Sequence, residues 1–239
     1  MSRPDFIIEK SFRTEGGALA TSFVQKARDK LLKRGFILLP SDTCYSLAAL
    51  AADEFARKSV NAILGRPDDP ISLAFPNYFS VHRLIEVDNT TALLLEHFTP
   101  GPITVVCQAK ADVSQDFLAN IASFDRTIGV RIPDSFIERE IAASTDYPLM
   151  SVAVRDDTGK PVQIFRDACE IVSAGTQRLG SVGWGAIEGD GFYFSHSTVV
   201  RVGGVDKVTL LREGDLLFDH ILRAVKTDHP SGFAMEDWG

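Results

Sequence analysis

The chain has 239 residues, of which 45% are hydrophobic and 24% are charged, and its formal net charge is −7. This length suits one large domain, or one domain with an appendage, that buries a sizeable core, and the acidic balance argues against a surface that binds polyanions generally. No apolar run reaches the length of a membrane span or resembles a signal peptide, so we expect a cytoplasmic protein with no membrane partner.

Apolar patterning predicts the first elements of the chain. Residues 6–8 are apolar between polar neighbours and favour an edge strand. Apolar residues recur at helical spacing over 18–34, where basic residues gather toward the end and Gly35 stops the helix. A continuous apolar run at 36–39 is typical of a strand buried on both faces, and a second apolar run follows at 47–52.

Between residues 53 and 174 the pattern alternates helices with short apolar strands, and proline or glycine marks several of the turns. The expected helices lie at 53–64, 77–85, 90–98, 113–122, 135–144 and 162–174. The expected strands lie at 71–75, 103–108, 127–132 and 148–154.

The last part of the chain is glycine-rich and β-like from Ser181 onward. Strands that alternate with helices early and gather late predict one α/β layered domain with a mixed sheet, covering 1–226, and we expect 227–239 to be a loose tail. The late strands are expected at 182–187, 192–194, 198–202 and 208–212, before a final helix at 215–226.

A group of polar side chains follows the strand at 36–39. Pro40 ends that strand, and residues 41–46, which we call the elbow, read Ser-Asp-Thr-Cys-Tyr-Ser. A tight turn needs one Asp or Ser, whereas a substrate pocket at the carboxyl end of a strand has use for the hydroxyls, the carboxylate and the phenol together. A capped turn is the alternative, and the sequence leaves Asp42 open as a turn residue or a metal-linked carboxylate.

Four arginines lie at predicted strand ends or turns, where proline or glycine fixes the backbone: Arg66, Arg131, Arg155 and Arg212. A guanidinium held in this way suits bidentate binding of phosphate or carboxylate, although a structural pair with one of the 32 acidic residues is the alternative for each. Together with the hydroxyls of Thr104 and Ser197, the arginines predict a cleft for a small anionic ligand.

The chain shows no motif of metal ligands or of a catalytic nucleophile. Its three cysteines and five histidines have no metal-ligand spacing, and neither a Walker A loop nor a dinucleotide fingerprint occurs. His196 adjoins the predicted cleft, but we interpret it as a loop residue. The residues themselves therefore predict no metal site and identify no catalytic residue.

Six motifs, in order over about residues 18–215, resemble those of the YrdC/YciO family, the threonylcarbamoyl-AMP synthases and their paralogues. They are PSDTCYSL from residue 40, LGRPDDPISL from 64, FTPGPITVV from 98, TIGVRIPD from 127, HSTVV from 196 and LLREG from 210. The resemblance implies an α/β (α+β) fold, a YrdC-like twisted mixed sheet with flanking helices around an open, positively lined cavity.

The resemblance also implies a function. Family synthases join L-threonine, bicarbonate and ATP into threonylcarbamoyl-AMP and pyrophosphate for a tRNA modification, and family members are described as binding ATP and double-stranded RNA or tRNA. ATP, with Mg²⁺ as its companion, is therefore the expected ligand. By position, Thr43 and Tyr45 would line the threonine end, and Thr104 and Arg131 would border the cavity. The nucleotide and phosphate side would hold Arg66, Ser151, Ser197 and Arg212.

Three motif positions depart from the synthase pattern. Leu64 stands where synthases have a lysine, Ala153 where they have an asparagine, and Ser46 where they have a glycine. Leucine supplies no positive charge, and losing one charge-assisted contact costs about 1.5–3 kcal/mol. Alanine offers neither the donor nor the acceptor of asparagine. YciO-type paralogues are similarly described as lacking the lysine and the asparagine.

We therefore expect a YciO-like protein that binds a nucleotide, and double-stranded RNA or tRNA, with impaired synthase activity. The alternative is an active L-threonylcarbamoyladenylate synthase in which Arg155, Lys160 or Lys58 supplies the missing charge. A pure RNA-binding module is a third hypothesis, supported only by the basic residues of 26–34 and opposed by the net charge of −7.

Overall fold

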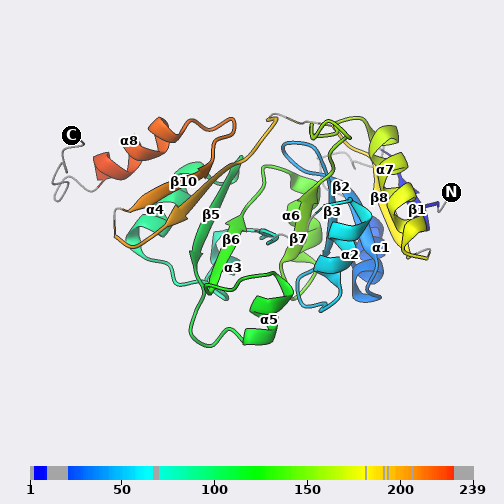
Figure 1. Cartoon of the computed structure of the whole chain (residues 1–239), viewed down its shortest axis with the longest axis horizontal. Coiled ribbons are helices and arrows are strands. Elements are labelled where there is room, and N and C mark those ends of the chain that lie inside the picture. Colours follow the sequence, from blue (N-terminus) through cyan, green and yellow to red (C-terminus); the bar gives the residue numbers. More distant parts are fainter. Residues whose placement is uncertain are drawn as a thin grey trace.

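The protein is described here by a computed structural model, which covers residues 3–9, 21–66, 70–180, 182–190, 192, 194–205 and 207–228. The ten described strands form one mixed sheet with helices on both sides (Figure 1). The expected fold class, a mixed sheet with flanking helices, is confirmed.

The strands run across the sheet in the order β1-β8-β2-β3-β7-β4-β6-β5-β9-β10. The apolar runs of the sequence form most of them, and the run at 103–108 has the expected bounds. The strands are β1 Phe6–Ile8, β2 Phe36–Pro40, β3 Tyr45–Leu50, β4 Leu73–Ala74, β5 Ile103–Gln108, β6 Thr127–Arg131, β7 Leu149–Ala153, β8 Trp184–Ile187, β9 Thr198–Val202 and β10 Val208–Arg212.

Several helices begin at a polar side chain that accepts a hydrogen bond from the first turn. Asp88 accepts from the amide of Thr91 at 2.7 Å, and Ser135 accepts from that of Glu138 at 3.3 Å. Such caps contribute about 1 kcal/mol each and fix where the helix starts. The helices are α1 Thr21–Leu32, α2 Ala56–Ile63, α3 Tyr78–Val81, α4 Asn89–Phe98, α5 Gln115–Asn120, α6 Phe136–Ala143, α7 Phe165–Arg178 and α8 Phe218–Asp228.

The prediction of a strand at 192–194 is wrong for Phe192 and Phe194, the two of these residues that the structure describes. Phe192 packs its ring edge-on against Tyr45, with 5.1 Å between the centroids, and the amide of Phe194 donates to the carbonyl of Asp42 at 3.2 Å. Neither residue belongs to a strand, and both contact the elbow instead.

Two other expected elements are shorter in the structure. The helix expected at 77–85 is one turn, α3, because Ile85 already pairs with Ala109 in an isolated bridge. The strand expected at 71–75 is reduced to the two residues of β4. The helix α8 reaches Asp228, while residues 18–20 of the first expected helix and 229–239 of the expected tail lie outside the described residues.

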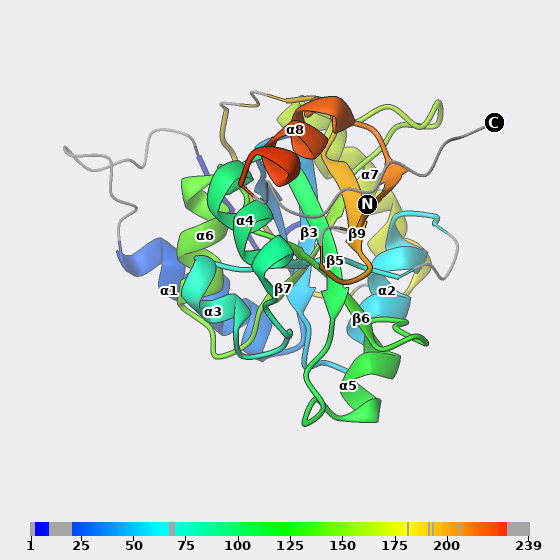
Figure 2. The same cartoon turned by 90° about the vertical axis from the view of Figure 1, so that its left-hand side faces the viewer.

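The half of the sheet around β2 and β3 is covered on both faces. Alternate residues of β2 point to opposite sides, so Ile37 and Leu39 pack in one cluster with α1 and α6, and Phe36 and Leu38 pack in another with α2 and α7. In the other half, α4 contacts β5 and α8 lies across α4 (Figure 2).

The two halves of the sheet are joined through the short strand β4. Leu73 pairs with Met150 of β7 and with Val130 of β6, and Ala74 pairs with Leu149 and Arg131. β4 pairs only with the end of β6 and the start of β7. The start of β6 and the end of β7 have no described strand between them, so the two strands separate there. Within the described residues, no helix combines the length and the hydropathy needed to cross a bilayer.

One prediction concerns the contact between α2 and α7. Gly175 is buried in α7, and a Cβ there would overlap the carbonyl oxygen of Ile63 at the end of α2. Gly175→Ala should lower the free energy of unfolding by about 1–3 kcal/mol through overpacking, although alanine is the better helix former. Urea unfolding measures this.

The control is Gln177→Ala, an exposed position two residues further along α7, which should change the free energy of unfolding by less than about 0.5 kcal/mol. A Gly175→Ala variant as stable as the Gln177→Ala variant would contradict the close packing of the two helices.

Candidate functional site

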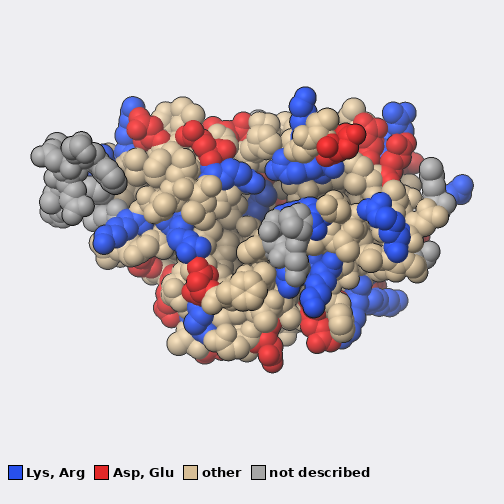
Figure 3. Space-filling view, viewed as in Figure 1, with Lys and Arg blue, Asp and Glu red and all other residues tan. Residues whose placement is uncertain are grey.

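A cavity of about 740 Å³ lies where the two halves of the sheet part. Figure 3 shows a hollow near the middle of this face, with lysine and arginine side chains around it. Alternate residues of three strands point into the cavity, as the two-residue period of a strand requires. They are Thr104 and Val106 on β5, Thr127, Gly129 and Arg131 on β6, and Val199 and Arg201 on β9.

The elbow forms one wall of the cavity through Thr43 and Cys44. Its turn is closed by the amide of Ser41, which donates to the carbonyl of Cys44 at 3.0 Å. Gln163 donates from its side-chain amide to the carbonyl of Thr43 at 2.8 Å. Burial raises the pKa of the Cys44 thiol to about 11, so this thiol is protonated at neutral pH and is a poor nucleophile.

Most of the residues expected at the site meet in this cavity, although they come from distant parts of the chain. They are Thr43, Arg66, Thr104, Arg131, Ser151, Ser197 and Arg212. The roles that the resemblance gives to each of them stay predictions.

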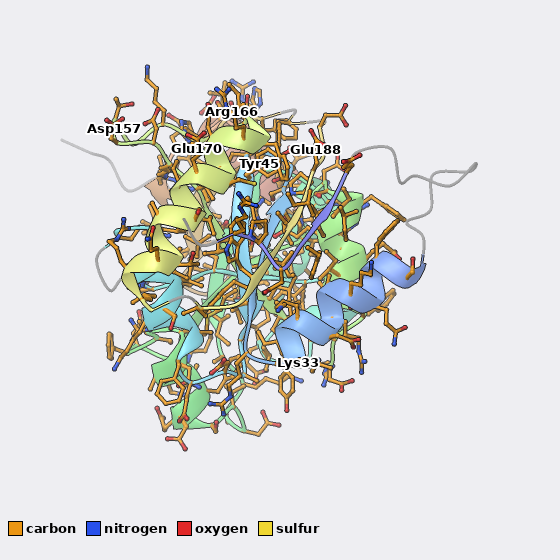
Figure 4. All side chains as sticks on the ribbon, turned by 90° about the vertical axis from the view of Figure 1, so that its right-hand side faces the viewer. Lys33, Tyr45, Asp157, Arg166, Glu170 and Glu188 are labelled. Carbon is orange, nitrogen blue, oxygen red and sulfur yellow. The ribbon has the colours of Figure 1, made fainter. Side chains whose placement is uncertain are left out.

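Tyr45 is the expected site residue that does not line the cavity. Its hydroxyl donates to the carbonyl of Gly189 at 2.7 Å and accepts from the Gly189 amide at 3.1 Å. Its ring lies beside Phe165 at the start of α7 (Figure 4), and burial raises the pKa of the phenol to about 12. The reason is the register of β3, in which Tyr45 shares a face with the core residues Leu47 and Ala49.

Arg131 is held by a buried ion pair. Its guanidinium donates to the Asp42 carboxylate at 2.5 Å and to the Ser41 hydroxyl at 3.3 Å. The second oxygen of Asp42 accepts from the amide of Asp134 at 3.0 Å. Burial alone would lower the pKa of Arg131, but the carboxylates of Asp42 and Glu138 raise it above its usual value.

Glu138 on α6 completes this buried group, and sequence reasoning missed it. Its side chain is fully buried and accepts from the Ser41 hydroxyl at 2.5 Å. Burial raises the pKa of the Glu138 carboxyl, while Arg131 and the hydroxyls of Ser151 and Ser41 act in the opposite sense. Ser151 in turn faces the cavity, so Glu138 lies directly behind the cavity wall.

Arg212 and Ser197 form a second fixed group. The guanidinium donates to the Ser197 carbonyl at 2.8 Å and to its hydroxyl at 2.9 Å. Two residues later Gly214 lies so close to the backbone of 196 and 197 that a Cβ would not fit. Asp215 then accepts from the amides of Ser195 and His196, at 2.6 and 2.5 Å. These contacts hold the HST and REG motifs against each other.

Positive charge is concentrated in the cavity. Desolvation and the neighbouring Arg155, Arg131 and Arg66 lower the pKa of the Arg212 guanidinium, which shows that these like charges lie close together. Arg201, which the sequence did not single out, also lines the cavity and pairs with Asp125 at 2.9 Å. Its spacing of two residues from Val199 along β9, which puts both side chains on one face of the strand, was the available signal.

The positions that depart from the synthase motifs differ in their surroundings. Ala153 lines the cavity, whereas Leu64 is half-buried against the main core and is not among the described lining residues. Of the three cations expected as replacements, Arg155 lines the cavity, and Lys58 and Lys160 do not. The described residues contain no group of three or more His, Cys, Asp or Glu that could hold a metal ion.

A first prediction at this site concerns the buried ion pair. Asp42→Asn leaves the Arg131 charge buried without its partner and should lower the free energy of unfolding by about 3–5 kcal/mol. The matched control is Asp219→Asn, which breaks an ion pair of 2.7 Å whose side chains are 73% and 69% exposed. Its cost should stay below about 1 kcal/mol. Equal costs in chemical denaturation would contradict the assignment.

A second prediction concerns Glu138. Because its pKa is raised in the folded state, its contribution to stability is present below the pKa of the unfolded chain and is lost as pH rises through the folded pKa. Glu138→Gln keeps an acceptor for Ser41 and cannot ionise. As the pH rises from 5 to 8, the free energy of unfolding of the variant should therefore increase relative to that of the wild type. Urea unfolding at several pH values measures this difference. A difference that does not change with pH would contradict the raised pKa.

Comparison with known proteins gives three informative similarities. The mouse threonylcarbamoyl-AMP synthase is 28% identical over 130 residues, which are 54% of this chain and 45% of that protein. The structure of Pyrococcus abyssi Sua5 complexed with L-threonine has a TM-score of 0.75 at 22% identity and covers 91% of this chain and 60% of that one. The structure of Escherichia coli YciO has a TM-score of 0.70 at 21% identity. The match covers 89% of this chain and 96% of that one.

The chain spans about half the length of the mouse synthase, and its likeness to the two solved structures concerns the fold. The model of the Sua5, YciO and YrdC family, described as "Telomere recombination", matches residues 29–214. With the six motifs and the shared fold in place, the chain belongs to the Sua5/YciO/YrdC family.

Proposed function

We propose that the protein binds a nucleoside phosphate in the cavity, as a YciO-type member of its family that makes threonylcarbamoyl-AMP slowly or not at all. The observation that carries the proposal is the convergence of Arg66, Arg131, Arg155 and Arg212 on one cavity, where desolvation, and then repulsion by the other three arginines, lowers the pKa of Arg212. A polyanion relieves that repulsion, and guanidinium groups bind phosphate in bidentate geometry. The volume of about 740 Å³ suits a ligand of nucleotide size.

The amino-acid end of the proposed ligand site lies at the elbow. The Pyrococcus abyssi relative was solved with L-threonine, and we transfer that ligand to the wall around Thr43 and Cys44. Tyr45 takes no part in this proposal because Gly189 occupies its hydroxyl. Mg²⁺ would enter bound to the phosphates of ATP, which is its usual mode in nucleotide sites. Binding of double-stranded RNA or tRNA stays a prediction of the resemblance.

Slow synthesis follows from what the cavity lacks. Ala153 faces the cavity and offers no hydrogen bond where synthases have asparagine. Leu64 contributes no charge and packs against the core. The missing charge-assisted contact of the lysine would cost about 1.5–3 kcal/mol of stabilisation.

An active synthase is the second candidate, and Arg155 favours it. This residue lines the cavity beside Ala153, and its guanidinium donates to the carbonyl of Gly159 at 2.7 Å, which fixes its position. In this alternative Arg155 replaces the charge of the missing lysine.

The test combines binding and turnover. ATP should raise the melting temperature of the protein, and Arg212→Ala should weaken ATP binding about 10- to 100-fold, the loss expected for a charge-assisted contact. Arg223→Ala, which removes an exposed arginine of α8 outside the cavity, is the control and should bind ATP like the wild type. Pyrophosphate release from L-threonine, bicarbonate, ATP and Mg²⁺ should stay well below that of the Pyrococcus abyssi synthase measured alongside.

The outcomes separate the two candidates. Release at the rate of the reference synthase, abolished in Arg155→Ala, would establish the active enzyme. If the protein is slow, the double variant Leu64→Lys with Ala153→Asn should release pyrophosphate faster than the wild type. Absence of any thermal shift with ATP or AMP would overturn the proposed nucleotide site.

A further inference from the structure

Phe124 is an exposed aromatic residue at the cavity. It lines the cavity and is 89% exposed, the largest exposed fraction among the large hydrophobic residues that the structure describes. Exposure of a whole phenylalanine ring is unfavourable because its apolar surface stays in water. A ring in this position is therefore a candidate for ligand contact, provided that the backbone holds it in place.

The backbone beside Phe124 is held by its neighbour Asp125. The Asp125 carboxylate accepts from the hydroxyl of Thr127 at 2.7 Å and from the guanidinium of Arg201 at 2.9 Å. These hydrogen bonds tie the segment to β6 on one side and to β9 on the other. The Thr127 hydroxyl and Arg201 also keep the pKa of Asp125 below its usual value, so its carboxylate stays charged.

Arg126 anchors the same segment from the opposite direction. Its guanidinium donates to the carbonyl of Lys110 at 2.8 Å, to that of Val113 at 3.3 Å and to that of Ala111 at 3.4 Å. Its own backbone has a φ of 57°, and Ala122 has a φ of 58°, conformations that non-glycine residues adopt only where the surroundings impose them. The segment thus presents the Phe124 ring from a fixed backbone.

The cavity combines this ring with concentrated positive charge. The arginines account for the phosphates of a nucleoside phosphate, and a flat aromatic ring beside them suits its planar base. Threonine has no flat face, so an amino-acid ligand gives the ring nothing to stack on. An aromatic side chain stacks on any nucleobase, because every base has a π-face.

We propose that Phe124 is the stacking platform for the nucleobase of the ligand, a proposal that rests on the nucleotide site proposed above. The phosphates pair with the cavity arginines, and the base lies against the Phe124 ring at the mouth. Stacking recognises the base by its shape and area, so Phe124 favours nucleotides over bare polyphosphates without selecting one base by hydrogen bonds.

The test compares two probes, ATP and inorganic tripolyphosphate, which share the phosphate chain and differ in the nucleoside. Phe124→Ala should weaken ATP binding about 5- to 150-fold, the effect of losing one base–aromatic stack. Tripolyphosphate should bind the variant within about twofold of the wild type, because the arginines are intact. Calorimetric titration gives both constants, and an unchanged melting temperature without ligand confirms the fold.

Three further variants refine the result. Phe124→Trp should bind ATP at least as tightly as the wild type, since its ring is larger. Phe124→Leu keeps apolar area but no plane and should lose most of the ATP preference. Phe79→Ala is the matched control, because Phe79 is 81% exposed and lies outside the cavity, and it should bind both probes normally.

Each other outcome overturns the proposal. If ATP binds and Phe124→Ala binds it like the wild type, the ring is not a platform, while the nucleotide site stands. If the variant loses ATP and tripolyphosphate equally, the substitution has disturbed the segment rather than a stack. If the wild type binds neither probe, the proposed function falls together with this inference.

Discussion

The buried contact between Arg131 and Asp42 is the interaction on which the arrangement of the cavity depends. Among the described strands, β4 joins the two halves of the sheet by pairing with β7 on one side and β6 on the other. Near that bridge, Asp42 in the elbow bonds both the side chain of Arg131 and the amide of Asp134. The elbow belongs to one half of the sheet and β6 to the other. The ion pair therefore fixes the distance between the two walls of the cavity.

Neighbouring contacts support the same junction. The Ser135 hydroxyl donates to the carbonyl of Pro40 at 2.7 Å, and the Ser41 hydroxyl donates to Glu138. Charged groups are buried only at a large desolvation cost, which good geometry and further hydrogen bonds must offset. Here the cost is incurred beside a cavity lined by cations, where Arg131 also presents its charge to the ligand space. The side chain that joins the two walls of the cavity is thus also one of those that line it.

Sequence patterns predicted the strands better than they predicted individual side-chain directions. Continuous apolar runs located the central strands because burial on both faces leaves little alternative. Arg66, Arg131, Arg155 and Arg212, which the sequence singled out, line one cavity in the structure. Tyr45 was misplaced because the elbow was taken to extend to Ser46, whereas β3 already starts at Tyr45 and its alternation turns the ring to the core. Glu138 gave no local signal, since its hydrogen-bond partner Ser41 lies 97 residues away in the chain.

Because β4 is so short, a ligand bound in the cavity would help to hold the two halves of the sheet together. A molecule lodged between β6 and β7 touches both halves of the sheet and acts as a removable cross-link between them. By mass action its binding free energy adds to the work of pulling the halves apart, about 2.7 kcal/mol at a ligand concentration one hundred times the dissociation constant. Occupancy of the cavity would therefore add to the hydrophobic core, the β4 pairing and the Arg131–Asp42 contact, which hold the two halves of the sheet together.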